Sequence, residues 1–166
     1  MQAFISCRLD YCNSLLYGMS HGNIRKVQSV QNAAARLLTG TIRRGDHISP
    51  VLRQLHWLPV QRRVDFKLAC FVFSSLSGQA HSYLTDDMHL VSEGPRRRLR
   101  SSTDRSCAVP RTHNTFGDRS FAVAEPRVWN SPPANLRDED ITYTSFMREL
   151  KTYWFSCGRG AMRHSA

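Results

Sequence analysis

Residues 59–78 read PVQRRVDFKLACFVFSSLSG, and this stretch decides the fold class. Val60, Val64, Leu68 and Phe71 recur at steps of four and three residues, which places them on one face of a helix. Proline before the first apolar residue favours a helix start, and glycine at the far end favours a stop. The pattern therefore predicts a long helix whose apolar face is widened by Val72, Phe73 and Leu76.

A first helix is expected upstream, ending near Gly18. Its apolar residues alternate between steps of four and three, at Ile5, Leu9, Cys12, Leu16 and Met19. A short helix is also expected from Ser49 to Leu55, because serine can cap a helix and Pro50 suits the first helical position.

Residues 20–40 predict a second long helix, capped by Ser20 and ended by Gly40. One side of this helix is apolar and is expected to be buried, at Val27, Val30, Ala34 and Leu37. The opposite side is polar and basic, at Arg25, Ser29, Asn32 and Arg36.

The composition changes after about residue 90. A short helix is expected around residues 83–88, and an arginine- and serine-rich segment follows it. Residues 107–109 favour a short strand and residues 116–124 a helix, after which prolines are expected to break the chain. A last helix begins near Ser145, with four residues on or beside its inner face: Phe146, Leu150, Tyr153 and Trp154.

The predicted fold class is therefore mainly α with a small α+β C-terminal part. The predicted domains are a helical unit over residues 1–90, a basic linker over 91–106, a small α+β unit over 107–157 and a disordered tail over 158–166.

Charge is the most informative feature of the composition. The chain has 166 residues with 23 Lys and Arg against 13 Asp and Glu, a formal net charge of +10. Such an excess favours a polyanionic partner, since phosphates release counterions when they are neutralised. No apolar run approaches the roughly 20 residues of a membrane span, so no membrane partner is expected. The odd number of cysteines and the absence of a signal-like start favour a cytoplasmic or nuclear protein over a secreted one.

The sequence offers little support for catalysis. Asp86 and Asp87 follow Tyr83 at one residue too many for the Tyr-x-Asp-Asp turn of polymerases, so they favour a solvated helix end over a metal site. The five cysteines lack zinc-ligand spacing, and Cys12 and Cys70 are expected to be core thiols. We expect no catalytic residue, no metal, no cofactor and no small-molecule substrate.

The candidate binding residues are basic. The planar guanidinium of arginine can donate two hydrogen bonds to a phosphate group. Contacts of this kind hold a nucleic acid by its backbone without recognising its base sequence. Any single arginine can equally be a solvated surface residue or pair with a nearby carboxylate. The candidates are Arg25, Arg36, Arg43, Arg44, Arg62, Arg63, Lys67, Arg96, Arg97, Arg98 and Arg100.

Several collinear stretches resemble one family. They include LDYCNSLLYG at 9–18, VQSVQNAAARL at 27–37, DHISPVL at 46–52, LHWLPV at 55–60 and AEPRVWN at 124–130. In order and spacing they resemble the region C-terminal to the polymerase core of LINE-type (non-LTR) retrotransposon reverse transcriptases, of the jockey-like branch. Pro132 departs from the pattern, since the family has leucine there.

The resemblance implies a non-catalytic accessory fragment of a reverse transcriptase, because the chain begins downstream of where the palm carboxylates would stand. It implies RNA or an RNA–DNA hybrid as partner, held by backbone phosphate contacts. Two alternatives stay open. One is a protein-interaction or structural module that docks on the missing polymerase core and exposes Phe4 and Ile5 when isolated. The other is a non-functional element relic.

Overall fold

The computed structural model describes residues 2–40, 46–86, 88–93, 105–114 and 116–157. Helices dominate this part of the chain, as the sequence predicts. The protein divides into two compact units: residues 1–65 with 154–166, and residues 66–153. The division falls inside two helices, α4 (Val60–Leu76) and α7 (Tyr143–Cys157).

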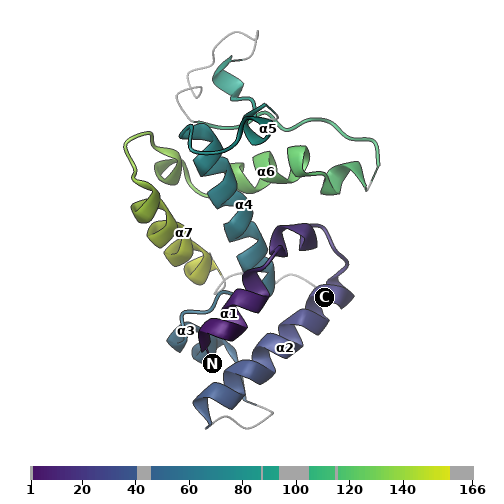
Figure 1. The fold of residues 1–166 in the computed structure, drawn as a ribbon, viewed down its shortest axis with the longest axis vertical. Helices are drawn as coiled ribbons and strands as arrows, with labels where there is room; N and C mark the ends of the chain where they lie inside the picture. The colour runs from purple at the N-terminus through teal and green to yellow at the C-terminus, as the bar shows by residue number, and fades with distance from the viewer. Residues whose placement is uncertain (1, 41–45, 87, 94–104, 115, 158–166) are drawn as a thin grey trace. The chain divides into compact units, whose positions relative to one another are not determined.

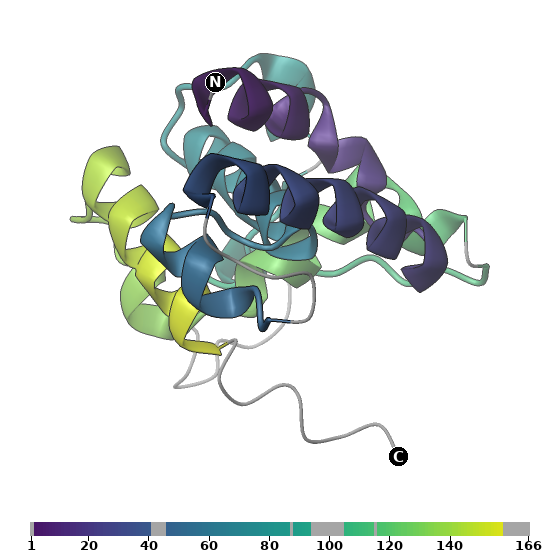
Figure 2. The same cartoon turned by 90° about the horizontal axis from the view of Figure 1, so that it is seen from below.

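The first unit is built from α1 (Gln2–Asp10), the short 3-10 helix η1 (Asn13–Leu16), α2 (His21–Thr39), α3 (Ser49–Gln54) and the start of α4. The segment formed by α1 and η1 lies alongside α2 in both views (Figures 1 and 2). These helices enclose one apolar cluster, with Ala35, Val51, Leu52 and Trp57 at its centre. Ile5 and Leu38 pack against the same cluster.

The predicted first helix is shorter than its pattern suggests. It ends at Asp10, because Cys12 adopts a left-handed conformation with φ of 50° and the chain turns there into η1. Left-handed backbone is costly for a residue with a Cβ and ends an α-helix. The apolar repeat therefore continues across a turn instead of along one helix, and the prediction that Cys12 is a core thiol is wrong, since its side chain is exposed.

The bounds of α2 agree with the sequence, but the predicted buried face is wrong. Gly40 ends the helix in a left-handed conformation, as expected. The residues that α2 buries, however, are Ile24, Gln31 and Ala35. Val30 and Leu37, which the pattern places in the core, are 64% and 72% exposed. The helix is thus rotated about its axis so that a face containing a glutamine points inward.

The second unit contains the remainder of α4, α5 (Ser82–Thr85), η2 (Val91–Glu93), η3 (Gly117–Arg119), α6 (Phe121–Asn130), η4 (Ala134–Arg137) and most of α7. Its core is aromatic. The Phe73 ring stacks on the Phe146 ring with 4.5 Å between centroids, and Trp129 tilts against Phe146 at 5.8 Å. Offset aromatic pairs of this kind add to the free energy gained from apolar burial. Phe146 and Leu150 of the predicted last helix are buried here, as expected.

Two local predictions for this unit are wrong. Pro126 does not break the chain but lies inside α6, where it is fully buried. The expected strand at 107–109 is absent from the described residues, which hold only an isolated antiparallel bridge between Leu90 and Cys107. The side chain of Asn130 explains this, because its amide accepts a hydrogen bond from the Cys107 N–H and donates one to the Cys107 carbonyl. A side chain thus takes the place of a neighbouring strand.

The two units do not follow the domain boundaries predicted at residues 90 and 107. The second half of α4 shares its aromatic core with α7, so these distant segments belong to one unit. Most of the predicted basic linker, residues 94–104, and the predicted tail from residue 158 lie outside the described residues. No helix in the described ranges combines the length and the apolar content needed to cross a membrane.

Candidate nucleic-acid interface

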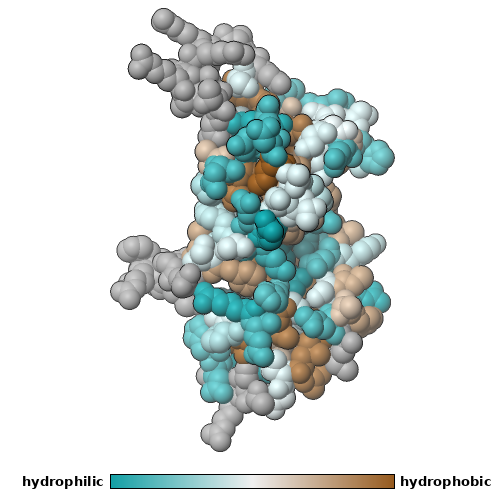
Figure 3. Space-filling view, turned by 90° about the vertical axis from the view of Figure 1, so that its left-hand side faces the viewer, coloured by the Kyte–Doolittle hydropathy of each residue, from teal (hydrophilic) through white to brown (hydrophobic). Residues whose placement is uncertain are grey.

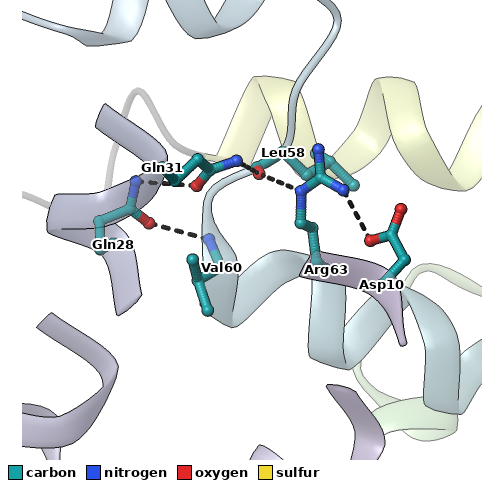
Figure 4. Close-up of polar contacts among 6 residues, drawn as sticks. All are labelled: Asp10, Gln28, Gln31, Leu58, Val60 and Arg63. Atoms are coloured by element: carbon teal, nitrogen blue, oxygen red, sulfur yellow. Dashed lines mark hydrogen bonds and ion pairs between the residues drawn. The ribbon is translucent and has the colours of Figure 1, made fainter. Parts of the chain in front are cut away.

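A partly buried polar network connects residues 9–18, 27–37 and 55–63 (Figure 4). The Gln31 amide donates to the Leu58 carbonyl at 2.8 Å, and the Arg63 Nε donates to the same oxygen at 3.1 Å. Gln28 accepts a hydrogen bond at 2.8 Å from the N–H of Val60, the first residue of α4. Helix N-termini leave such donors unsatisfied, so Gln28 caps α4 from a distant part of the chain.

Arg63 belongs to this network and not to the exposed basic surface. Its side chain is only 9% exposed, and a guanidinium nitrogen lies 2.6 Å from the Asp10 carboxylate. Its guanidinium carbon also lies 5.8 Å from the centre of the Trp57 ring. Because the side chain is nearly buried and two of its nitrogens donate inside the first unit, the geometry favours a structural role for Arg63 over the phosphate contact that its sequence position suggested.

Arg62 is also engaged within the first unit, although it is partly exposed. It forms an ion pair with Asp65 at 3.3 Å and stacks over the Trp154 ring at 4.5 Å. Burial raises the pKa of the Asp65 carboxyl, while hydrogen bonding from Gln61 and the charge of Arg62 lower it by less. Any phosphate that contacts Arg62 would compete with this carboxylate.

The basic side of α2 holds two of the predicted site residues. Arg25 is exposed and Arg36 is half-buried, and they lie three turns apart on one side of the helix, about 16 Å along its axis. Lys26, which the sequence pattern did not single out, is exposed next to Arg25. The 19 residues of α2 include no Asp or Glu, so nothing on this helix neutralises the three cations.

Two further exposed cations lie outside α2, and of these only Lys67 belongs to the predicted set. Arg53 of α3, which the sequence pattern also missed, is exposed and donates to the Phe155 carbonyl at 3.4 Å. Lys67 is exposed in the second unit, with its ammonium 5.1 Å from the Phe71 ring centre. Arg43, Arg44, Arg96, Arg97, Arg98 and Arg100 lie outside the described residues.

The charge of the sequence is divided unequally between the two units. Residues 1–65 and 154–166 hold eleven Lys and Arg against three Asp and Glu, a net charge of +8. Residues 66–153 hold twelve against ten, a net charge of +2. The electrostatic attraction for a polyanion is therefore concentrated on the first unit. Charge along the sequence reveals this bias only once the unit boundaries are known.

The second unit contains a polar surface pocket of about 470 Å³, bordered by η4 and the residues that follow it. Arg137 lies in its wall but donates inward, to the carbonyls of Trp129, Asn130 and Pro132. Arg105 lies 3.6 Å from the Glu139 carboxylate at the same pocket. With Asp138 and Asp140 also lining it, the pocket carries both signs of charge and does not suit a phosphate.

Other reactive side chains occupy ordinary structural positions. Cys70 is buried, which confirms the prediction of a core thiol there. Burial raises the pKa of this thiol to about 11, and Tyr143 is its hydrogen-bonding neighbour. Asp86 is exposed after α5, and Asp87 lies outside the described residues. Within the part of the chain that the structure describes, no three His, Cys, Asp or Glu side chains come together as a metal site would require.

Comparisons of the chain with protein-family models, with curated proteins and with solved structures find no match.

Proposed function

We propose that this protein is a non-catalytic nucleic-acid-binding module that holds RNA or an RNA–DNA hybrid through its phosphate backbone. The observation that carries the proposal is the charge of the first unit, +8, together with the acid-free helix α2 that exposes Arg25 and Lys26. Backbone phosphates are the ligand that best matches arginines spaced along a helix that has no acidic residue of its own.

The expected mode of binding is electrostatic and independent of base sequence. A 19-residue helix is about 28 Å long, enough for several consecutive phosphates of one strand to lie along it. The hydroxyl of Ser29 and the amide of Asn32 lie on the same side of α2 as Arg25 and Arg36, and such groups donate well to phosphate oxygens.

By resemblance, the module would be a C-terminal accessory fragment of a non-LTR retrotransposon reverse transcriptase. In that setting other parts of the parent protein would copy RNA into DNA, and this fragment would grip the template. The motif residues Asp10, Gln28 and Arg63 support the proposal only indirectly, since they hold the first unit together.

Filter binding of the whole chain to single-stranded RNA at several salt concentrations tests the proposal. Log affinity should fall linearly with log salt, with a slope of about −0.7 for each neutralised phosphate. Absence of binding at low salt, or an affinity independent of salt, would contradict it.

A matched pair of triple variants tests the location of the site. Arg25→Gln/Lys26→Gln/Arg36→Gln removes three charges from α2, and Arg111→Gln/Arg119→Gln/Arg148→Gln removes three exposed charges from the second unit. Only the α2 variant should make the salt slope clearly shallower, by up to about 0.7 for each phosphate that is no longer neutralised. Equal effects in both variants would mean that net charge alone, and not α2, drives binding.

A second candidate function is protein interaction, favoured by apolar side chains that the first unit leaves in solvent. Phe4 is 65% exposed and Tyr11 is 78% exposed. Apolar residues also reach the surface in separate patches on the face drawn in Figure 3. A module that docks on a polymerase core would show such residues when isolated. Light scattering separates the two functions, because added salt weakens an RNA complex but not apolar self-association.

A further inference from the structure

An apolar stripe runs along the solvent side of α2 and touches the apolar cluster of the first unit at Ala34. Its members are spaced by three, four and three residues, which aligns them over about 15 Å of the helix. Val30 and Leu37 are mostly exposed, and Val27 and Ala34 beside them are half-buried. We name these four residues, Val27, Val30, Ala34 and Leu37, the α2 stripe.

The exposure of the stripe follows from the polar network of the first unit. Gln31 must reach the Leu58 carbonyl and Gln28 must cap α4, so these side chains turn inward with Ala35. Val30 and Leu37 lie one and two positions from Gln31 and Ala35, on another side of a helix with 3.6 residues per turn, and therefore face solvent. The spacing of the stripe is nevertheless that of a helix–helix seam. Two large aliphatic side chains are left in water in a pattern that one further helix could cover.

Charge identifies the kind of helix that fits. Lys26 borders the stripe, Arg25 and Arg36 lie on the basic side of α2 away from it, and α2 has no acidic residue. A second copy of this chain would bring another unit of net charge +8 against the first, with like charges opposed. A helix with acidic flanks would instead set carboxylates against Lys26 and the positive charge of the first unit while its apolar face covered Val30 and Leu37.

We propose that the α2 stripe is the docking site for an amphipathic helix of a partner protein whose apolar face is flanked by acidic residues. This interaction is separate from the proposed nucleic-acid binding, which uses the basic side of α2.

Fluorescence anisotropy with three labelled peptides of about 18 residues tests the proposal on the whole chain. The first has leucines at steps of three and four with glutamates at the flanks, the second has the same leucines with lysines, and the third is the first in scrambled order. The acidic amphipathic peptide should bind at least about tenfold more tightly than either of the others. Equal affinities, or no binding of the first peptide, would overturn the proposal.

Paired variants locate the interaction. Val30→Gln/Leu37→Gln should reduce peptide affinity at least about tenfold, while Val91→Gln/Val109→Gln, which changes exposed residues of the second unit, should not. Circular dichroism confirms that both variants are folded. RNA affinity, measured in parallel, should be unchanged in the first variant, so failure of the docking proposal is distinct from failure of the proposed function.

Two other occupants would overturn the proposal if they depended on the same substitutions. One is a second copy, detected by sedimentation as a dimer that Val30→Gln/Leu37→Gln dissociates. The other is a membrane surface, detected as binding to phosphatidylserine-containing vesicles that these substitutions abolish while the acidic peptide fails to bind.

Discussion

Arg63 belongs to a basic sequence pattern that predicts phosphate binding, but its contacts in the structure stabilise the fold. Its guanidinium donates hydrogen bonds to both the Leu58 carbonyl and the Asp10 carboxylate. These bonds connect the segment just before α4 to the end of α1. A planar fork can make both hydrogen bonds from one position, and a lysine ammonium cannot reproduce that geometry.

Arg63→Met should therefore lower the free energy of unfolding by about 2 kcal/mol, because it removes hydrogen bonds made by a buried charged group. Urea denaturation measures the change. Arg63→Lys should restore less than half of the loss.

The exposed Arg25 provides the control for this prediction. Arg25→Met should change the free energy of unfolding by less than about 0.5 kcal/mol. If Arg63→Met left stability intact and weakened RNA binding instead, the structural role assigned to Arg63 would be wrong.

At the scale of the element, the rotation of α2 is the main difference between pattern and structure. The apolar spacing of Val30 and Leu37 predicts a buried face, and the structure buries Gln31 and Ala35 in its place. Periodicity weighs each residue by its own hydrophobicity, so it cannot anticipate that two glutamines will find partners in the segment that begins α4.

The rotation predicts opposite outcomes for two substitutions two residues apart. Leu37→Gln should alter the free energy of unfolding by less than about 0.5 kcal/mol, since the leucine is already in water. Ala35→Leu should lower it by about 1–3 kcal/mol, because a larger side chain must enter the packed cluster around Trp57. Thermal and urea unfolding measure both variants. A large loss of stability in Leu37→Gln and a small one in Ala35→Leu would instead show that the apolar face predicted from the sequence is the buried one.

Element boundaries were more predictable than element faces. Gly40 and Gly78 have φ near +66° and +68°, and each follows the end of its helix as the sequence indicated. These stops depend on local backbone preference, which sequence shows directly. The prediction for Pro126 was wrong because the helix that contains it loses one hydrogen bond but buries the proline ring in the core of the second unit.

At the scale of the whole molecule, two carboxylates should shape the response to acid in opposite ways. Hydrogen bonding from Thr112, and then from Arg127, lowers the pKa of Asp118, whereas burial raises the pKa of Asp65. Above the ordinary aspartate pKa of about 3.9, the lowered pKa of Asp118 stabilises the fold, and this contribution is lost as the pH falls below that value through the lowered pKa of the folded state. The raised pKa of Asp65 has the opposite effect on stability, because the ionised carboxylate destabilises the fold at neutral pH.

Melting temperatures measured from pH 7 down to pH 3 should reflect these signs. Asp118→Asn should melt below the wild type at pH 7 and approach it as the pH falls. Asp65→Asn should melt at or above the wild type at pH 7, and any advantage should disappear in acid as the wild-type carboxyl takes up a proton.

The exposed Asp86 supplies the control, and Asp86→Asn should follow the wild-type curve throughout. A loss of stability at pH 7 in Asp65→Asn as large as that in Asp118→Asn would show that the ion pair with Arg62 outweighs the cost of burial.

The amino-acid sequence alone determined the helical class, the bounds of the long helices and the excess of positive charge, because spacing, capping residues and composition are local quantities. Only the tertiary structure decided which face of α2 is buried, where the two units divide and which arginines remain exposed. These depend on hydrogen bonds and packing between segments far apart in the chain, such as Arg63 with Asp10 and Phe73 with Phe146. A single side chain reveals nothing of such a partner until the backbone brings the two together.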